Sequence, residues 1–396
     1  MRTCAIICEY NPFHNGHKYQ IQKIRALGIT HVIAIMSSNF TQRGAPAVIS
    51  KFPRAKSALL CGVDIVLELP TVFSTARAQD FAFAGVYIAN ALNCVDYLSF
   101  GCETCNIEIL KTAAKASLNS LIENDLREKL SSGVTFAKAR QEAIGLHFGT
   151  TIADVFSHSN NNLAVEYIKA LNVLNSSIVP LPIKRYKASH FDNSFNGNFC
   201  SSSYIRENIN SRKISKFMPK KSFEILKNEL NDKKGPANIS FAERAVLYKL
   251  KTMENKSFEL LPDVSEGLGT KLYNEVKKSS SLNELYELVK TKRYTLARLQ
   301  RIILSAYLNI SKDDLSFKSP YIRVLGFNKK GSEILKTAKE KSILPIVTKY
   351  SDVKRLNNSD CLKFFEKETR FTELYSLMLP SINNCSNEKT SRIIKI

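Results

Sequence analysis

Residues 4–17 read CAIICEYNPFHNGH, and this stretch decides the fold. Its first five residues form an apolar, β-prone run of strand length, and helical spacing follows the last residue, so the turn between them joins a buried strand to a helix. Asn11 and Pro12 are typical turn residues, and Gly16 lets the backbone approach a ligand closely. Because the amides at the start of a helix attract anions, the stretch predicts a phosphate-binding site.

The same turn carries two imidazoles, His14 and His17, three residues apart. Both can donate hydrogen bonds to phosphate oxygens as negative charge builds during displacement at the α-phosphorus of a nucleoside triphosphate. Two histidines at this spacing also occur as one core and one surface residue, or as a metal pair. The strand-turn-helix context favours the nucleotide, so we expect His14 and His17 to be catalytic.

Five β-rich runs alternate with helical patterns along the first half of the chain, which predicts an α/β domain with a parallel sheet. The predicted strands cover residues 3–8, 31–37, 64–69, 96–100 and 177–183, and the predicted helices cover residues 18–27, 52–61, 77–92 and 106–130. In open sheets of this type ligands bind beyond the carboxyl ends of the strands. We expect this domain to span residues 1–215.

A second phosphate-binding element is predicted at CSSSYIR, residues 200–206. Serine hydroxyls at the start of a helix satisfy its free amides, so Ser201 and Ser202 taken alone indicate only a helix cap. Together with the histidine turn, we expect both serines to contact phosphate and Arg206 to face the outer phosphates. Asn11 and Arg206 would then bracket one nucleotide.

The second half of the 396-residue chain differs in pattern and charge. Amphipathic helical patterns with lysine-rich faces run through residues 223–230, 241–252, 281–289 and 294–308, which predicts a mostly α-helical domain over residues 216–396. The formal net charge is +21, and residues 201–396 hold 38 basic and 22 acidic side chains against 19 and 14 in residues 1–200. This excess indicates a polyanionic partner, although a lysine-rich proteome would raise the charge without one.

The helical pattern at residues 294–308 places Leu296, Leu299 and Ile303 on an inner face and Arg298 and Arg301 on the outer face. Arginine at this spacing suits the phosphates of an RNA backbone. A solvated basic face fits this helix alone equally well. The charge of the whole half favours RNA, so we predict that Arg298 and Arg301 bind it.

The cysteines and the lengths of the apolar runs indicate where in the cell the protein resides. Nine irregularly spaced cysteines, with no leader pattern before the first strand, indicate reduced thiols in the cytoplasm. No apolar run reaches the length of a membrane span. Cys102 and Cys105 form the only CxxC pair, and a metal site of this type needs a second pair or spaced histidines. We therefore predict a cytoplasmic protein with no metal site, membrane partner or DNA partner.

The turn at residues 11–17 resembles the HxGH signature of a nucleotidyltransferase superfamily, whose members form or break an AMP linkage. Further segments resemble the tRNA(Met) cytidine acetate ligase family, and they lie in both halves of the chain: residues 37–46, 51–56, 68–70, 100–103, 159–161, 183–185, 294–301 and 320–327. Two positions depart from the family pattern. Ala45 stands where the family usually has glutamate, and Ser38 replaces a common glycine.

The resemblance implies a Rossmann-like nucleotidyltransferase domain and a two-step reaction. Acetate attacks the α-phosphate of ATP to give acetyl-adenylate, and the wobble cytidine of elongator tRNA(Met) then takes the acetyl group to become N4-acetylcytidine. ATP and acetate are the expected co-substrates, and we expect Mg²⁺ because triphosphate chemistry commonly uses it. The wobble base lies in a single-stranded loop, where Phe or Tyr can stack on a splayed base.

By the same resemblance, the residues around these motifs would bind ATP. The set comprises Ile7, Cys8, Glu9, Tyr10, Asn11, Pro12, Phe13, His14, Asn15, Gly16, His17, Lys18, Tyr19, Gln20, Gly101, Asn160, Asn161 and Arg185, together with Ser201, Ser202 and Arg206. The departures at residues 38 and 45 lie outside this set.

Two other functional classes stay open at this point. A small-molecule adenylyltransferase would use His14 and His17 to join AMP to a cofactor precursor, with the basic half incidental, but such enzymes are usually much shorter. A non-catalytic RNA-binding protein with a relic nucleotide site would need neither histidine.

Overall fold

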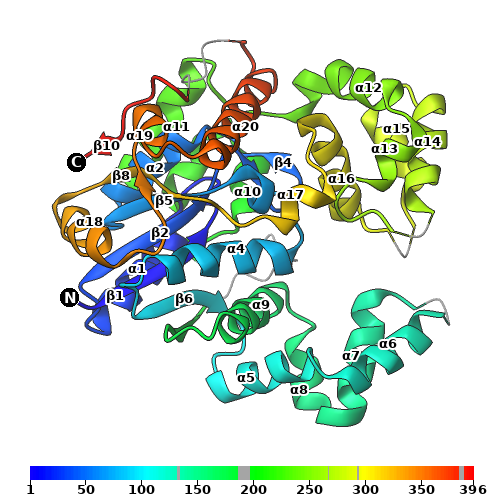
Figure 1. The fold of residues 1–396 in the computed structure, drawn as a ribbon, viewed down its shortest axis with the longest axis horizontal. Coiled ribbons are helices and arrows are strands. Elements are labelled where there is room, and N and C mark those ends of the chain that lie inside the picture. The colour runs from blue at the N-terminus through cyan, green and yellow to red at the C-terminus, as the bar shows by residue number, and fades with distance from the viewer. Residues whose placement is uncertain (132–133, 186–196, 266, 292–293, 383–387) are drawn as a thin grey trace.

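The computed structural model describes residues 1–396 except 132–133, 186–196, 266, 292–293 and 383–387. Among the described residues, eight strands form one sheet in the order β10-β8-β5-β2-β1-β6-β7, with β9 paired to β8 (Figure 1). A two-stranded hairpin, β3 (Phe40–Thr41) and β4 (Ala45–Pro46), lies apart from it. The predicted fold class, a Rossmann-like α/β domain with a parallel sheet followed by a mostly α-helical part, is confirmed, and the sheet is mixed but mostly parallel.

The five strands from the first half of the chain run parallel. They are β1 (Thr3–Cys8), β2 (His31–Ser37), β5 (Ile65–Leu69), β6 (Tyr97–Cys102) and β7 (Val179–Lys184). The predictions for β1 and β2 match at both ends, and the other three differ by one or two residues. This agreement places the histidine turn at the carboxyl end of the central strand.

Helices cover both faces of the sheet (Figure 1). One layer contains α1 (Asn15–Ala26) and α2 (Lys51–Leu60), and the other contains α4 (Ala78–Ala91), α9 (Ser159–Val173) and α18 (Lys329–Lys341). Cys4 and Ile6 belong to the core with α1 and α2, whereas Ala5 and Ile7 belong to the core with α4 and α9. Successive strand side chains point to opposite faces, so a strand covered on both sides must be apolar throughout.

Two groups of short helices project beside the sheet (Figure 1). One comprises α5 (Ile107–Ala116), α6 (Ser120–Ser131), α7 (Phe136–Phe148) and α8 (Thr150–Val155); the other comprises α12 (Glu243–Thr252), α13 (Asn255–Glu259), α14 (Leu268–Lys278), α15 (Leu282–Val289) and α16 (Leu296–Leu308). The remaining elements include α3 (Thr71–Ser74), α10 (Ser202–Glu207), the 3₁₀ helices η1 (Arg212–Phe217) and η2 (Ile239–Ala242), α11 (Lys220–Asn231), α17 (Lys312–Ser316), α19 (Tyr350–Arg355) and α20 (Ser359–Ser376).

The single helix predicted over residues 106–130 is wrong, because the chain breaks between α5 and α6. The side chain of Asn119 accepts a hydrogen bond from the backbone N–H of Leu121 at 3.0 Å. Asparagine competes in this way with a continuing helix and starts a new one instead.

The helices predicted in the second half of the chain are present. The prediction for residues 223–230 lies within α11, and the prediction for residues 241–252 corresponds to η2 followed by α12. The predictions for residues 281–289 and 294–308 correspond to α15 and α16.

Three strands of the sheet come from the end of the chain: β8 (Ile322–Phe327), β9 (Ile346–Val347) and β10 (Ile394–Lys395). β8 pairs antiparallel with β5, and β9 and β10 pair parallel with β8. No strand is predicted there from the sequence, because a short apolar run does not distinguish a buried strand from a buried helix segment. The domain boundary at residue 215 stays a prediction, and β8 shows that the segments on either side of it share one sheet.

A buried charge cluster joins the two ends of the chain. Lys51 Nζ lies 2.5 Å from Glu68 Oε1 and also contacts Glu388. Arg323 Nη1 lies 3.2 Å from Glu68 Oε2 and 2.5 Å from Glu388 Oε2. All four side chains are at most 3% exposed. Burial alone would raise the pKa of Glu388, but Arg323 and Lys51 lower it to about 2, so the carboxylate stays charged inside the protein.

Removing one member of this cluster leaves its partners charged and unpaired in the interior. We expect Lys51→Met to lower the free energy of unfolding by about 3–5 kcal/mol, measured by urea titration, because breaking a buried ion pair costs about that much. Lys56→Met is the matched control, since Lys56 lies on the same helix but is exposed, and it should shift stability by no more than about 0.5 kcal/mol. Equal effects of the two substitutions would contradict the structural role of the cluster.

Candidate functional site

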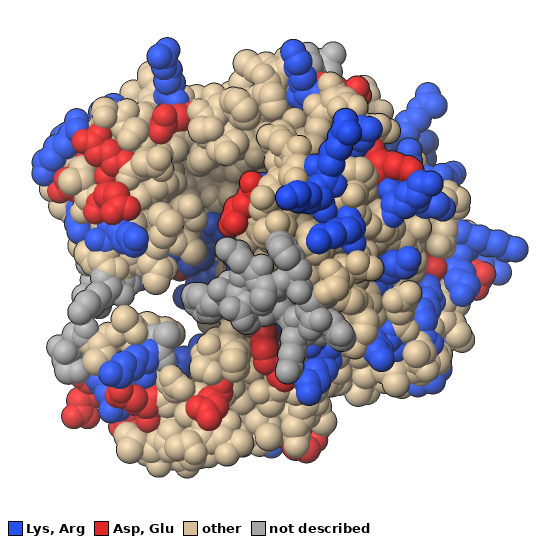
Figure 2. Space-filling model, turned by 180° about the vertical axis from the view of Figure 1, so that it is seen from behind, with Lys and Arg blue, Asp and Glu red and all other residues tan. Residues whose placement is uncertain are grey.

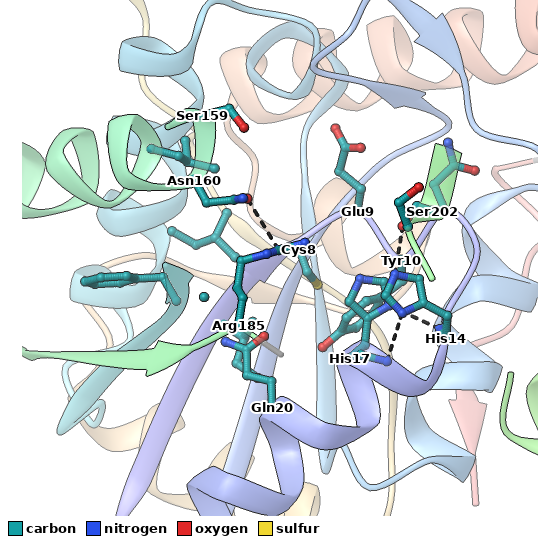
Figure 3. A pocket seen from close by; sticks show the side chains of 18 of the residues that line it. Cys8, Glu9, Tyr10, His14, His17, Gln20, Ser159, Asn160, Arg185 and Ser202 are labelled. Atoms are coloured by element: carbon teal, nitrogen blue, oxygen red, sulfur yellow. Dashed lines mark hydrogen bonds between the residues drawn. The ribbon is translucent and has the colours of Figure 1, made fainter. Parts of the chain in front are cut away.

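A cavity of about 360 Å³ opens at the carboxyl ends of β1, β6 and β7 (Figure 3). Its walls come from the turn after β1, the ends of β6 and β7, the start of α9 and the serine turn before α10. This is where an open parallel sheet places ligands. The histidine turn and residues 200–203 and 206, far apart in the sequence, therefore line one cavity, and their binding of one nucleotide stays a prediction.

Two hydrogen bonds inside the histidine turn fix the protonated nitrogen of each ring. His14 Nδ1 accepts from the backbone N–H of Gly16 at 3.0 Å, and His17 Nδ1 accepts from the backbone N–H of His14 at 3.2 Å. Since each Nδ1 accepts, a neutral ring must carry its proton on Nε2. The rings stack with centroids 3.7 Å apart (Figure 3).

Both rings are neutral in this environment. Burial lowers the pKa of His14 to about 3, and the nearby charges of Arg185 and Arg206 add to the effect. Burial, together with His14 and Arg185, also holds the pKa of His17 well below its usual range. His14 Nε2 donates to Ser202 Oγ at 2.9 Å. The pair therefore presents neutral Nε2–H donors, which suit the oxygens of a phosphate.

The serine turn is tied to the histidine turn by one arginine. Ser201 caps α10 by accepting from the backbone N–H of Tyr204 at 3.1 Å. Arg206 donates from Nη1 to the carbonyl oxygen of Asn11 at 3.0 Å and from Nη2 to Ser203 Oγ at 2.9 Å. The side chain of Asn11 points elsewhere, since its Oδ1 accepts from the backbone N–H of Val48 at 2.8 Å. Arg206 thus lies beside the turn, and Asn11 positions the loop after β4.

The far end of the cavity is built around Arg185. Its Nη1 donates to Asn160 Oδ1 at 3.4 Å, and Asn160 Nδ2 donates to Glu103 Oε1 at 2.6 Å. Gly101 leaves room for the arginine, because a Cβ there would lie 3.2 Å from Arg185 Cγ. Asn161 is fully buried, and its Oδ1 accepts from the backbone N–H groups of residues 103 and 104, so it holds this turn from behind.

The chain is similar to known proteins over its whole length. The family profile described as HIGH nucleotidyl transferase matches residues 1–390. A protein of Thermoanaerobacter sp. (strain X514) named tRNA(Met) cytidine acetate ligase is 40% identical over 387 residues, which cover 95% of each chain. One of the same name from Clostridium perfringens (strain ATCC 13124) is 38% identical over 412 residues, covering 100% of each chain. The chain belongs to the tRNA(Met) cytidine acetate ligase family.

Solved structures of this family align with the whole chain. The crystal structure of Thermotoga maritima TmcAL bound with alpha-thio ATP has a TM-score of 0.91 at 32% identity, and the apo form has a TM-score of 0.92 at 33% identity. Both alignments cover 100% of each chain. The family resemblance stated from the sequence motifs is therefore confirmed.

Most residues predicted to bind ATP line the cavity, but some do not. Pro12, Phe13, Asn15, Lys18 and Asn161 are absent from the lining among the described residues. Asn15 Nδ2 instead donates to the backbone carbonyls of residues 198 and 216, and the ring of Phe13 packs against Tyr10. Their assignment to ATP stays a prediction, and the structure gives these two residues and Asn161 supporting contacts.

Sequence reasoning left several lining residues out of the predicted site. They are Ile6, Gln42, Arg43, Phe81, Phe100, Ser159, Leu163, Tyr167, Ile183, Lys184, Phe199, Cys200 and Ser203. The strongest available signal was the QRG turn after β2, because the end of a central strand is where ligands bind. The apolar residues carry no such signal, since a core position and a cavity wall look alike in the sequence.

The QRG turn is held rigidly at the edge of the cavity. Gln42 donates its backbone N–H to Glu9 Oε1 at 2.8 Å, and Arg43 Nη1 lies 3.4 Å from Ser203 Oγ. Gly44 has φ of +75°, and a Cβ there would lie 2.4 Å from the backbone nitrogen of Arg301 on α16. Neither residue that departs from the family pattern lines the cavity: Ser38 is fully buried beside Glu368, and Ala45 lies in β4.

Arg298 and Arg301 are both engaged within the protein. Arg298 donates to the backbone oxygen of Asp263 at 2.7 and 3.0 Å and to Ser265 Oγ at 2.9 Å. Arg301 donates to Asp263 Oδ2 at 2.7 and 2.9 Å. These bonds give both arginines a role in holding the turn before α14 against α16. Their binding of tRNA stays a prediction.

The described residues contain neither a cluster of metal ligands nor a helix that could span a membrane. No group of three or more His, Cys, Asp or Glu side chains there is arranged to hold a metal ion. None of the helices in the described ranges combines the length and the apolar character that a transmembrane span requires. Cys102 Sγ and Cys105 Sγ lie 3.3 Å apart as free thiols.

The hydrogen bonds of the histidine turn generate a prediction for NMR. With ¹⁵N-labelled histidine, His14 and His17 should keep the shifts of neutral, Nε2-protonated rings from pH 8 to pH 5, because the pKa of each is lowered. In urea the same histidines should titrate near pH 6.5. Below that pH the unfolded state binds protons at these histidines and the folded state does not. The free energy of unfolding therefore falls as the pH drops below about 6.5. A cationic ring at pH 6 in the folded protein would contradict this.

Proposed function

We propose that this protein is an ATP-dependent tRNA(Met) cytidine acetate ligase, which activates acetate as acetyl-adenylate and acetylates the wobble cytidine of elongator tRNA(Met). The observation that carries the proposal is the joining of the histidine turn and the serine turn in one cavity, in a chain that belongs to this family over its whole length. Relatives carry the name of this activity, and the Thermotoga maritima relative binds an ATP analogue.

In this proposal ATP lies along the cavity. The Nε2–H groups of His14 and His17, the hydroxyl of Ser202 and the guanidinium of Arg206 would bind the triphosphate. Arg185, Asn160 and Gly101 would bind the adenosine end. The support is that both groups line the same cavity, with His14 bonded to Ser202 and Arg206 bonded to the turn after β1 in one group, and Arg185 bonded to Asn160 in the other.

The first step would join acetate to AMP. A carboxylate oxygen attacks the α-phosphorus, the bond to the β-phosphate oxygen breaks, and pyrophosphate leaves. Neutral imidazoles suit this step because their N–H bonds strengthen as charge gathers on the leaving oxygens. Mg²⁺ bound to the triphosphate would be held chiefly by phosphate oxygens and water, and it would neutralise part of that charge.

The tRNA would approach over a basic surface next to the histidine turn. Figure 2 shows Lys and Arg side chains spread over the face of the molecule that lies behind in Figure 1. Lys220 and Lys221 are exposed at the start of α11, and the neighbouring Ser222 Oγ donates to the carbonyl oxygen of Phe13 at 2.9 Å. The start of α11 therefore packs directly on the histidine turn, which favours these lysines over the engaged Arg298 and Arg301 as RNA contacts.

The decisive assay combines purified protein, ATP, acetate and unmodified elongator tRNA(Met), followed by mass spectrometry of the nucleosides. We expect N4-acetylcytidine that depends on both ATP and acetate. His14→Ala and His17→Ala should each lower the rate by about 10²–10³-fold, since each removes a donor to developing charge. His147→Ala, an exposed histidine on α7, is the control and should leave the rate unchanged.

Two further measurements separate the alternatives. Pyrophosphate exchange into ATP that ignores acetate but depends on a cofactor precursor would indicate a small-molecule adenylyltransferase. Full cellular modification of the tRNA in a strain carrying both histidine substitutions would indicate a non-catalytic RNA-binding protein. Either result would overturn the proposal.

The basic surface yields a separate prediction. Lys220→Glu combined with Lys221→Glu should weaken tRNA binding by about ten-fold or more and flatten its dependence on salt, because fewer counterions are released. Acetate-dependent pyrophosphate exchange without tRNA should not change. Lys329→Glu combined with Lys330→Glu is the matched control, an exposed lysine pair at the start of α18. Equal weakening by both pairs would show that only net charge matters.

A further inference from the structure

Glu9 is an anomaly in this cavity. Among the described residues that line the cavity it is the one acidic side chain, while Arg43, Lys184, Arg185 and Arg206 are basic. Figure 3 shows its carboxylate projecting into the cavity from the end of β1, on the side of Ser202 and Asn160. The family resemblance puts Glu9 in the predicted ATP-binding set, but a negative charge facing a triphosphate is repulsive, so binding ATP does not explain why its side chain is acidic.

The position of Glu9 is fixed on both its backbone and its side chain. Its carbonyl oxygen accepts from Arg54 Nη1 at 2.6 Å, and Arg54 is 1% exposed. Its Oε1 accepts from the backbone N–H of Gln42 at 2.8 Å. Within the described part of the chain, Oε2 forms no hydrogen bond or ion pair. One carboxylate oxygen is thus anchored and the other is available to a substrate.

The second half-reaction needs a proton acceptor. When the exocyclic N4 amine of cytidine attacks the acetyl carbonyl, the N–C bond forms, the C–O bond to AMP breaks, and the nitrogen must lose a proton. The histidines do not offer an acceptor, because each Nδ1 lone pair already accepts a backbone N–H. Each Nε2 carries the proton in the neutral ring. The thiol of Cys8 is buried, and burial raises its pKa far above the usual range, so no thiolate is available there.

We propose that Glu9 is the general base of the acetyl-transfer step. Its Oε2 takes the proton of the N4 amine as that nitrogen attacks acetyl-adenylate, and AMP leaves with the electron pair of the broken C–O bond. The inference rests on the proposed function and assigns the two half-reactions to different side chains. His14 and His17 serve adenylate formation, and Glu9 serves the transfer of acetyl to the tRNA.

The test measures the two half-reactions separately in Glu9→Gln. This substitution keeps an oxygen that can accept from Gln42 and removes only the basic oxygen. Acetate-dependent exchange of labelled pyrophosphate into ATP, without tRNA, should stay within about three-fold of the wild type. The single-turnover rate of acetyl transfer from preformed acetyl-adenylate to tRNA should fall by about 10²–10⁴-fold.

Two further variants sharpen the result. Glu9→Asp, which restores a carboxylate on a shorter side chain, should recover part of the transfer rate. Glu340→Gln, an exposed glutamate on α18, should behave like the wild type in both assays. An unchanged transfer rate in Glu9→Gln would overturn the proposal. So would a parallel loss of both half-reactions, which would assign Glu9 to ATP or its magnesium. A wild-type protein that makes no acetylcytidine would instead overturn the proposed function itself.

Discussion

The site depends on the two hydrogen bonds that close the first turn of α1. They connect the imidazole of His14 to the backbone of Gly16 and the imidazole of His17 to the backbone of His14. Both rings are thereby fixed in orientation and in the nitrogen that carries the proton. Their burial at the end of β1 keeps them uncharged. The same contacts that begin a helix therefore also orient two neutral N–H donors, and the roles proposed for Arg206 and Glu9 depend on that orientation.

The cavity is completed by segments from the whole length of the chain. Arg206 connects the serine turn to the histidine turn, and Gly44 lets the QRG turn lie against the backbone of α16. The buried cluster of Lys51, Glu68, Arg323 and Glu388 joins the first helices to the last strands. Since the pKa of Glu388 is lowered, its share of stability is present above the ordinary carboxyl pKa and is lost as the pH falls toward about 2.

Local pattern was enough to predict the central strands and the histidine turn, because an apolar run followed by a turn and a helix is a property of neighbouring residues. It was not enough for β8, whose pairing with β5 depends on residues more than 250 positions away. Nor could the local pattern show that Arg298 and Arg301 bind Asp263. It also could not show that Glu9 lies in a cavity lined by basic side chains, since both arrangements depend on long-range contacts. The break between α5 and α6 was different: Asn119 was visible, but its capping role competes with a helical pattern that continues through it.

The position of β8 and Glu388 near the end of the chain has a consequence for synthesis on the ribosome. Until about the last eighty residues emerge, β5 is an open edge of the sheet, and Lys51 and Glu68 lack half of their counter-charges. A nascent chain at that stage already contains every described residue that lines the cavity, yet its sheet is unfinished on one side. Completion of the sheet that carries the cavity thus waits for residues near the C-terminus, so a truncation far from the cavity would leave that sheet unfinished.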